Sequence, residues 1–308
     1  MVTVAIAGAT GHVGKTIAEV LQDDSKHDLI ILSRKKADSK TSATPVITVN
    51  YDDIDSLVDT LEKNGIHTVI SAILVKDAES SASEVALVRA ASRSSVTKRF
   101  IASDYAAPIP EMKQFGRILA RRATAQELHK TSLEWTTIRV GQFADHLGIP
   151  HIKSYMNPVA INVDVANRAA AIPGSGNDLI AYTYSFDMAK FVVAALNLPK
   201  WDRDLFCYSD KTTLNQIVKL AEKARESKFD VAYDSLEKLN RGEITELPSH
   251  TSVYSMIPKE TIQENFSKYS LYALDGLFDF PKENTLNAKF PEIKTMTMAD
   301  MLGFWRGK

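Results

Sequence analysis

The stretch VTVAIAGATGHVG, residues 2–14, decides the fold. Residues 2–7 are apolar and rich in β-branched side chains, which is typical of a strand buried on both faces of a parallel sheet. From Val13 onward apolar side chains recur at helical spacing, with Ile17 one turn further along the same face. The order of strand, glycine turn and helix predicts a dinucleotide-binding fold.

Glycines occupy the turn because a pyrophosphate must approach backbone N–H groups at the positive end of the helix. We expect Gly8 to make the tight turn, Gly11 to admit the phosphate and Gly14 to let the helix pack on the strand. The spacing is GxxGxxG rather than GxGxxG, and the alternative is a glycine turn in an α/β protein that binds no nucleotide. The residues predicted to hold the dinucleotide here are Gly8, Thr10, Gly11, His12, Val13 and Gly14.

A second apolar run, residues 28–32, ends in the basic sequence Ser33-Arg34-Lys35-Lys36. In NAD-binding sites an acidic residue about 20 positions beyond the glycines binds the ribose hydroxyls. Arg34 stands at that position, and a guanidinium suits a 2′-phosphate. The sequence therefore favours NADP(H) over NAD, bound through Ser33, Arg34 and Lys35, and the alternative is a solvated basic loop.

Strands and helices continue to alternate beyond this point. Further strands are predicted at residues 46–49, 67–73, 99–102 and 135–140. Helices are predicted between them at residues 54–61, 80–92 and about 111–130. This order predicts an α/β protein with a Rossmann-type doubly wound parallel sheet, in which ligands lie at the carboxyl ends of the strands. We expect further cofactor contacts there from Asp52, Ser71, Ala72, Ile73, Ser103, Gly141, Gln142 and Phe143.

The regular alternation weakens from Pro150, which suggests two domains. Residues 1–150 are predicted to form an NADP-binding Rossmann domain whose sheet is completed by segments from residues 151–200. Residues 151–308 are predicted to form a smaller α+β lobe that binds the substrate.

The predicted substrate lobe holds helical segments. Thr212 or Thr213 can cap a helix over residues 214–225, and residues 249–280 are expected to be helical and to line the substrate side. One helix face there would form an apolar wall, with ordinary core packing as the alternative. That face would consist of Leu274, Leu277 and Phe278.

Composition limits the class of protein. The chain has 308 residues, and 37 Lys+Arg against 38 Asp+Glu give a formal net charge of −1, which argues against a general electrostatic nucleic-acid binder. The single cysteine, Cys207, cannot form an internal disulfide, so a disulfide-stapled secreted scaffold is excluded. The apolar runs are shorter than the ~18 residues of a membrane helix. We expect a cytoplasmic monomer or homodimer with a small apolar substrate, without a metal, nucleic acid or membrane.

Several segments resemble one known family. GATGHVG, SRKK, VISAI, VTKRFIASDYA and WTTIRVGQFAD look like segments of the NmrA-like and isoflavone-reductase-like atypical short-chain dehydrogenases. The later stretch AIPGSGNDLIAYTYSFDMAKFVVAAL resembles the family's entry to its second lobe, where an Asp, here Asp187, opens a helix. The resemblance implies a Rossmann domain that binds NADP(H), with a smaller lobe over the nicotinamide. Members include reductases of plant phenolics, quinone reductases, fungal secondary-metabolite enzymes and a regulator that binds dinucleotide without catalysis.

The catalytic residues depart from the family patterns. Ordinary short-chain dehydrogenases use a YxxxK pair, but here Ile109 follows Tyr105 and Val159 follows Tyr155 at the lysine position. Tyr105 lies just past the predicted strand at residues 99–102, where it could donate a proton to a carbonyl or enolate. The alternative for Tyr105 is a buried aromatic ring with a satisfied hydroxyl.

The isoflavone-reductase-like branch instead uses a lysine shortly before an Arg-Arg-Ala sequence. Matching residues 121–123 to that sequence puts Arg117 at the lysine position, and matching Trp135 puts Arg121 there. Arginine is a poor general acid but can hold an anionic oxygen. Lys113, four residues before Arg117 on the same predicted helix face, could replace the missing lysine, and a solvated face is the alternative. The predicted catalytic residues are Tyr105, Lys113 and Arg117.

These observations predict an NADPH-dependent reductase of an apolar carbonyl or conjugated small molecule, acting in secondary metabolism. Two alternatives stay open. One is an NADP(H)-sensing, non-catalytic regulator with a protein partner, and the other is a redox-silent isomerase or cyclase on the same scaffold.

Overall fold

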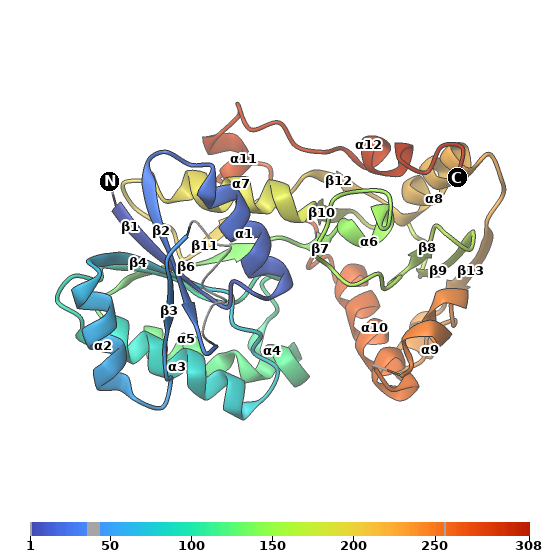
Figure 1. The fold of residues 1–308 in the computed structure, drawn as a ribbon. Helices are drawn as coiled ribbons and strands as arrows, with labels where there is room; N and C mark the ends of the chain where they lie inside the picture. The colour runs from blue at the N-terminus through green and yellow to red at the C-terminus, as the bar shows by residue number, and fades with distance from the viewer. Residues whose placement is uncertain (1, 36–43, 256) are drawn as a thin grey trace. The chain divides into compact units, whose positions relative to one another are not determined.

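The computed structural model describes residues 2–35, 44–255 and 257–308 (Figure 1). Lys36 lies outside the described residues, and so does the side chain of Arg117. The chain folds into two compact units, each built from two segments. The first unit comprises Met1–Arg139 and Ala189–Leu205, and the second comprises Val140–Met188 and Phe206–Lys308. The chain thus enters the second unit before residue 150 and returns later to complete the first.

One sheet forms the centre of the first unit. In the described part of the chain it has seven strands in the order β11-β6-β5-β4-β1-β2-β3. Their bounds are β1 Val2–Ala7, β2 His27–Ser33, β3 Val46–Thr48, β4 Ile66–Ser71, β5 Arg99–Ile101, β6 Glu134–Arg139 and β11 Asp204–Phe206. The pairings from β6 across to β3 are all parallel, which confirms the predicted Rossmann-type α/β fold.

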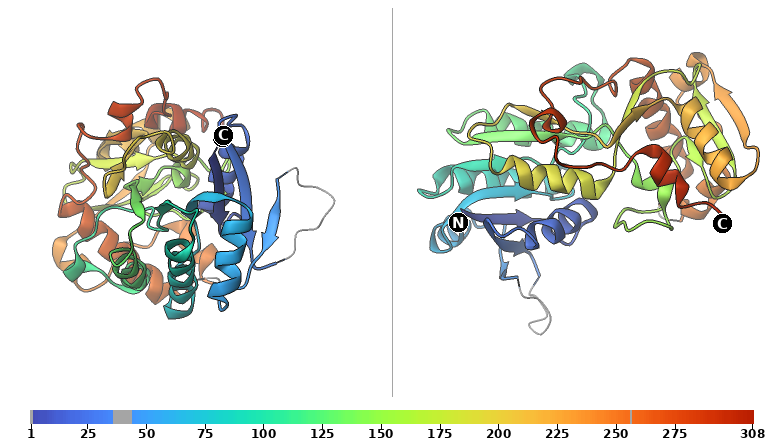
Figure 2. Two further views of the ribbon diagram at one scale, coloured as in Figure 1. Left: turned by 90° about the vertical axis from the view of Figure 1, so that its left-hand side faces the viewer. Right: turned by 90° about the horizontal axis from the view of Figure 1, so that it is seen from above.

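Helices cover both faces of this sheet, with α2, α3 and α5 on one face and α1 on the other (Figures 1 and 2). Their bounds are α1 His12–Gln22, α2 Ile54–Lys63, α3 Ala78–Arg93, α4 Gly116–Ala120 and α5 Arg122–Leu128. Ala5 and Ala7 of β1 share a core cluster with Leu57 of α2 and Leu87 of α3. Ile6, between the two alanines, is fully buried as well. Strand β1 is therefore buried on both faces, as its apolar run predicts.

Local capping fixes where two of these helices begin. The side chain of Asp53 accepts a hydrogen bond from the Ser56 backbone N–H at 3.0 Å, which caps α2. Asp77 and Ser80 form a reciprocal capping box at the start of α3. Each cap satisfies backbone donors that have no partner inside the helix.

The single helix predicted over residues 111–130 is wrong. The segment instead forms a short 3₁₀ turn, Glu111–Lys113, followed by α4 and then α5. The break arises because Gln114 and Phe115 adopt extended backbone angles, which interrupt the helical hydrogen-bond ladder. Lys113 and Arg121 consequently do not share one continuous helix face.

The second unit combines short strands and helices, as predicted for an α+β lobe. Its described residues form two three-stranded sheets, β12-β10-β7 and β13-β9-β8. The strand bounds are β7 Gln142–Phe143, β8 Val163–Asp164, β9 Ala169–Pro173, β10 Ile180–Thr183, β12 Asp210–Thr212 and β13 Asp230–Asp234. The helices are α6 Asp145–Gly148, α8 Leu214–Arg225, α9 Leu236–Asn240, α10 Lys259–Leu274, α11 Leu286–Lys289 and α12 Met298–Gly303. Helix α7, Ser185–Ala195, contributes its first residues to this unit and the rest to the first.

Two predictions for the second unit have opposite outcomes. Thr213 caps α8 by accepting from the Gln216 backbone N–H, as predicted. The predicted helix face that joins Leu274 to Leu277 is wrong, because α10 ends at Leu274 and Gly276 turns the chain with a φ of +73°. In the ranges that the structure describes, no helix combines the length and apolarity needed to span a membrane.

Candidate functional site

A cavity of about 350 Å³ lies at the glycine turn in the first unit. Gly8 adopts a φ of +84°, and a Cβ there would lie 2.4 Å from the Ala72 carbonyl oxygen. A Cβ at Gly14 would lie 2.3 Å from the Gly8 carbonyl oxygen. Glycine is therefore required at both positions, since β1, β4 and α1 approach too closely for any side chain. At Gly11 the nearest atom to such a Cβ is the Gly8 carbonyl oxygen at 3.4 Å, an ordinary van der Waals contact, so close packing does not require glycine there.

The N-terminus of α1 fits an anionic group. Gly11 caps the helix without a side-chain acceptor, and the first turn carries no acidic residue. The first backbone N–H groups of the helix point outward and are not satisfied within it. Together with the helix dipole they form an anion site, which suits the phosphates of a dinucleotide.

The cavity brings together many of the residues predicted from the strand ends. The predicted residues that line it are Gly8, Thr10, Gly11, Ser33, Arg34, Ala72 and Ile73. It does not include the exposed residues His12, Lys35 and Asp52, nor the partly or fully buried residues Val13, Gly14, Ser71 and Ser103. A direct role for these seven residues in cofactor binding stays a prediction.

Tyr51, which the sequence reasoning missed, also lines this cavity. It follows β3, and β3 lies beside β2 with Ser33 opposite Thr48. Burial raises the pKa of Tyr51 to about 12, although the positive charge of Arg34 lowers it. Tyr51 and Arg34 thus place an aromatic ring and a cation in the lining of the same cavity. The signal in the sequence that could have identified Tyr51 is its position next to Asp52, a predicted cofactor contact.

The ends of β4 and β5 are joined by hydrogen bonds through Ser103. The Ser103 hydroxyl donates to the Ile73 carbonyl oxygen at 2.7 Å, and its backbone N–H donates to Glu84 Oε1 at 2.8 Å. Thr124 donates to the other oxygen of Glu84 at 2.9 Å. Burial raises the pKa of Glu84 above its usual range, although these hydrogen bonds oppose the shift. Ser103 thus contacts the wall of the glycine-turn cavity through Ile73.

Tyr105 is buried, and its hydroxyl donates to the Ser71 carbonyl oxygen at 3.0 Å. Burial raises the pKa of this phenol far above its usual value, and the neighbouring Glu84 adds to the effect. A hydroxyl that is buried and committed to a backbone carbonyl is poorly placed to protonate a substrate. The geometry therefore favours packing as the role of Tyr105, and its predicted catalytic role stays untested.

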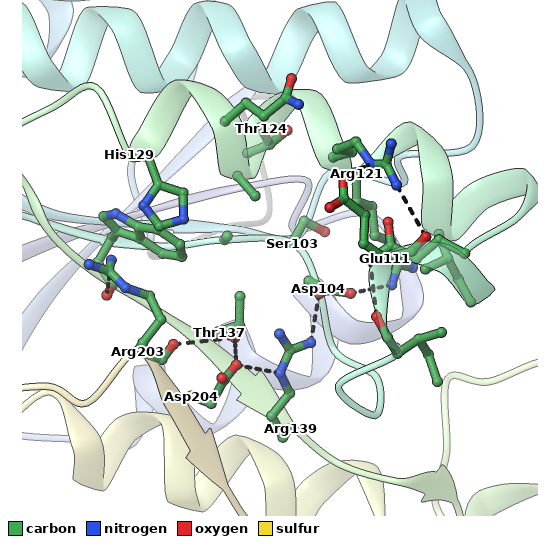
Figure 3. Close-up of a pocket in the computed structure, with 18 of the residues that line it drawn as sticks. Ser103, Asp104, Glu111, Arg121, Thr124, His129, Thr137, Arg139, Arg203 and Asp204 are labelled. Carbon is green, nitrogen blue, oxygen red and sulfur yellow. Dashed lines mark hydrogen bonds and ion pairs between the residues drawn. The ribbon is translucent and has the colours of Figure 1, made fainter. Parts of the chain in front are cut away.

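Lys113 and Arg121, which flank the interruption of the predicted helix at residue 114, have different surroundings. Lys113 is exposed on the 3₁₀ turn. Arg121 instead donates to Asp104 at 2.7 Å, and Arg139 donates to the other oxygen of Asp104 at 2.7 Å (Figure 3). Burial would raise the pKa of Asp104, but the two guanidiniums outweigh it and hold the pKa below its usual range. Arg121 is thereby engaged in an ion pair with Asp104.

Gly141, Gln142 and Phe143 belong to the second unit. Gly141 has a φ of +62°, and a Cβ there would lie 2.2 Å from the Ala181 carbonyl oxygen. Gln142 is buried and pairs with Tyr182 across parallel strands β7 and β10. The backbone of this segment is fixed by that pairing, and its predicted cofactor contacts stay a prediction. Among the described residues, no group of His, Cys, Asp or Glu side chains is arranged to hold a metal ion.

Comparison with known proteins relates the chain to fungal oxidoreductases. Residues 8–157 match the NAD(P)H-binding family of domains. The chain is 32% identical to oxidoreductase swnN of Metarhizium robertsii (strain ARSEF 23 / ATCC MYA-3075), covering 97% of this chain and 96% of that protein. It is 31% identical to oxidoreductase BOA1 of Botryotinia fuckeliana (strain B05.10), covering 95% of this chain and 96% of that protein.

Solved structures share the fold at low sequence identity. A leucoanthocyanidin reductase from Vitis vinifera bound to NADPH superposes with a TM-score of 0.72 at 18% identity, covering 98% of each chain. An isoflavone reductase superposes with a TM-score of 0.71 at 16% identity, covering 97% of this chain and 98% of that one. These structures confirm the predicted isoflavone-reductase-like fold. By its identity to the fungal proteins along nearly its whole length, the chain belongs to the family of NAD(P)H-binding oxidoreductases that includes swnN and BOA1.

Proposed function

We propose that the protein is an NADPH-dependent reductase of an apolar carbonyl or conjugated small molecule, acting in secondary metabolism. The observation that carries the cofactor preference is Arg34, which lines the glycine-turn cavity at the end of β2. An acidic residue at this position would repel a 2′-phosphate and bind the two ribose hydroxyls of NAD. A guanidinium can form paired hydrogen bonds with a phosphate.

The turn around Arg34 supports this role. The Ser33 hydroxyl accepts a hydrogen bond from the Lys35 backbone N–H at 3.1 Å, which folds the chain tightly after β2. Arg34 is exposed at the crest of that turn while still lining the cavity. An exposed guanidinium is available to a ligand phosphate, and Tyr51 gives the same cavity an aromatic surface.

A bound reduced dinucleotide supplies a hydride, and the protein must then stabilise the substrate oxygen and deliver a proton. Lys113 and Arg117 are proposed for these two tasks. An exposed ammonium such as that of Lys113 can donate a proton, whereas Arg117 can only stabilise negative charge. Tyr105 is a weaker candidate because its hydroxyl is already bonded to Ser71.

One observation supports the proposed reaction type and another supports the substrate class. The fungal relatives are oxidoreductases, and a structurally similar protein, AtPrR2, has been solved with NADP+ and (+)-pinoresinol, at a TM-score of 0.74 and 17% identity. A largely apolar molecule with oxygen substituents is therefore the proposed kind of substrate.

The test is a titration of the purified chain with NADPH and NADP+, followed by nicotinamide absorbance against a panel of enones, quinones and aldehydes. The proposal predicts tight binding of NADPH and oxidation of NADPH by at least one class. Tight binding without turnover on any class would point to the dinucleotide-sensing regulator instead. Absence of binding to either nucleotide would overturn both.

A further inference from the structure

A second, larger cavity of about 480 Å³ lies in the first unit between α5 and the sheet (Figure 3). It runs along β6 from Trp135 to Arg139. Helix α5 packs mainly against α3, which leaves space between α5 and β6. This cavity and the glycine-turn cavity share no lining residue. Its volume is within the range of small-molecule sites.

The two ends of this cavity differ in chemistry. At one end Arg203 stacks over the Trp135 ring at 3.6 Å, and the His129 ring meets the same indole edge-on at 5.0 Å. At the other end the lining includes Arg121 and Glu111, which are labelled in Figure 3. Small apolar side chains, among them Ala125 of α5, form part of the wall between.

Most charges in the lining are already paired. Asp104 accepts from Arg121 and Arg139, and Asp204 accepts from Arg139 at 2.6 Å. Glu111 pairs with Arg122 at 3.0 Å. These pairs neutralise three guanidiniums with three carboxylates, and they leave little net charge at that end of the cavity.

Arg203 is the remaining guanidinium of the lining. It donates to the Trp135 carbonyl oxygen at 3.2 Å, and among the described residues it forms no ion pair within 4 Å. The Asp204 carboxylate, whose charge acts on Arg203, is already paired with Arg139. The remaining carboxyl, Glu84, has both of its oxygens engaged, one by the Ser103 backbone N–H and one by the Thr124 hydroxyl. The lining therefore offers, at the Trp135 end, a guanidinium that can pair with an anionic group.

Three buried polar atoms of the lining have no hydrogen-bond partner among the described residues: the Nε donors of Arg121 and Arg122 and the Oε1 acceptor of Gln114. Arg122 Nε lies 3.0 Å from Glu111 in an ion pair, so the atoms of Arg121 and Gln114 are the two left without a polar partner. Buried polar groups are almost always hydrogen-bonded, so these atoms indicate a polar group that belongs in the cavity. A hydroxyl can both accept from a guanidinium and donate to an amide oxygen.

We propose that this cavity is a second ligand site, which binds a small aryl carboxylic acid with a hydroxyl group at its far end. The carboxylate would pair with Arg203, the flat apolar body would lie along β6 beside Ala125, and the hydroxyl would meet Arg121 and Gln114. Four residue steps along β6 span about 13 Å, which is enough for a hydroxylated phenylpropenoic acid. The site lies outside the dinucleotide cavity and is additional to the proposed reductase function.

The test uses the full chain, saturated with NADP+, and isothermal titration calorimetry with 4-hydroxycinnamate. The matched uncharged probe is 4-hydroxycinnamamide. We expect saturable binding of the acid and at least about tenfold weaker binding of the amide, because a charge-assisted hydrogen bond is lost. No saturable binding of the acid, or equal binding of acid and amide, would overturn the proposal. The acid titration can be repeated without nucleotide, so its outcome is independent of the proposed reductase function.

Two variants locate the ligand. Arg203→Gln removes the unpaired charge, and Ala125→Phe fills the cavity; each should weaken binding of the acid by about tenfold or more. The control is Arg93→Gln. Arg93 is exposed on α3, pairs with Asp55 and lines neither cavity, so this change should alter the affinity for the acid less than about twofold. Unchanged NADP+ affinity shows that each variant is folded. Binding of the acid that is unaffected by either variant would place it elsewhere and overturn the assignment.

Discussion

The hydroxyl of Ser103, at the end of β5, donates a 2.7 Å hydrogen bond to the carbonyl oxygen of Ile73, which lines the glycine-turn cavity beyond β4. The backbone N–H of Ser103 also donates a hydrogen bond to the Glu84 carboxylate. The position of the cavity wall therefore depends on a residue that does not line that cavity.

Ser103→Ala should lower the free energy of unfolding by about 1 kcal/mol, because a buried carbonyl loses its donor. It should also weaken NADPH binding, since Ile73 is no longer held. Urea unfolding and a nucleotide titration measure the two effects. Ser252→Ala is the control, because this exposed hydroxyl also donates to a backbone carbonyl, in the second unit. Equal NADPH affinity in wild type and Ser103→Ala would show that the bond does not position the cavity.

Gly8→Ala should abolish dinucleotide binding and destabilise the protein. The new Cβ would lie 2.4 Å from the Ala72 carbonyl oxygen, and the backbone has a φ of +84°. Gly65→Ala is the matched control, because Gly65 also has a positive φ, of +58°, but nothing lies within 4 Å of its added Cβ. Gly65→Ala should cost only the backbone term of about 1–2 kcal/mol. Thermal unfolding and NADPH titration compare the two variants. Equal losses of stability and of NADPH affinity in both would mean that close packing at Gly8 is unimportant.

Arg34→Ala should weaken NADPH binding by about tenfold or more, because a charged hydrogen-bond pair with the 2′-phosphate is lost. NADH binding, which involves no 2′-phosphate, should change little. Parallel fluorescence titrations with both nucleotides give the ratio of NADPH affinity to NADH affinity for the variant and the wild type. Arg93→Ala serves as the control for removing an exposed arginine elsewhere in this unit. Equal weakening for NADPH and NADH would refute the assignment of Arg34.

The free energy of unfolding of Glu84→Gln should increase relative to that of the wild type as pH rises. Burial raises the pKa of Glu84, so above its ordinary pKa the folded state binds more protons than the unfolded state. Stability contributed by the neutral carboxyl is then lost with rising pH, and glutamine has no proton to lose. Urea unfolding of both proteins at about pH 5 and about pH 8 measures this difference. A stability difference that does not change with pH would contradict it.

Tyr105→Phe separates packing from catalysis. If the hydroxyl serves only Ser71, its loss should reduce the free energy of unfolding by about 1 kcal/mol and leave turnover nearly unchanged. Lys113→Met, on the exposed 3₁₀ turn, should by contrast reduce turnover while NADPH affinity stays the same. The measurement is kcat against the best substrate of the panel. A large loss of turnover in Tyr105→Phe alone would return the proton-donor role to Tyr105.

Local patterns in the sequence were sufficient for much of this fold. The apolar run at residues 2–7, the glycine spacing and the helical spacing after Val13 each depend on neighbours within a few positions. Caps such as that of Thr213 on α8 are equally local. For the same reason Arg34 could be placed at the end of β2, because the chain order of a Rossmann fold sets which strand end meets the ribose.

Other features depend on contacts between distant segments. Two extended residues broke the helix predicted over residues 111–130, which no periodicity indicated. Glu84 and Thr124 meet although 40 positions separate them, and the Asp104 carboxylate gathers guanidiniums from two different elements. Such pairs form because packing of α3 and α5 on the sheet brings their side chains together, and burial then changes their pKa. The sequence by itself thus determined the Rossmann unit and its phosphate-binding turn, whereas only the tertiary structure decided which charged groups are buried, paired or left facing a cavity.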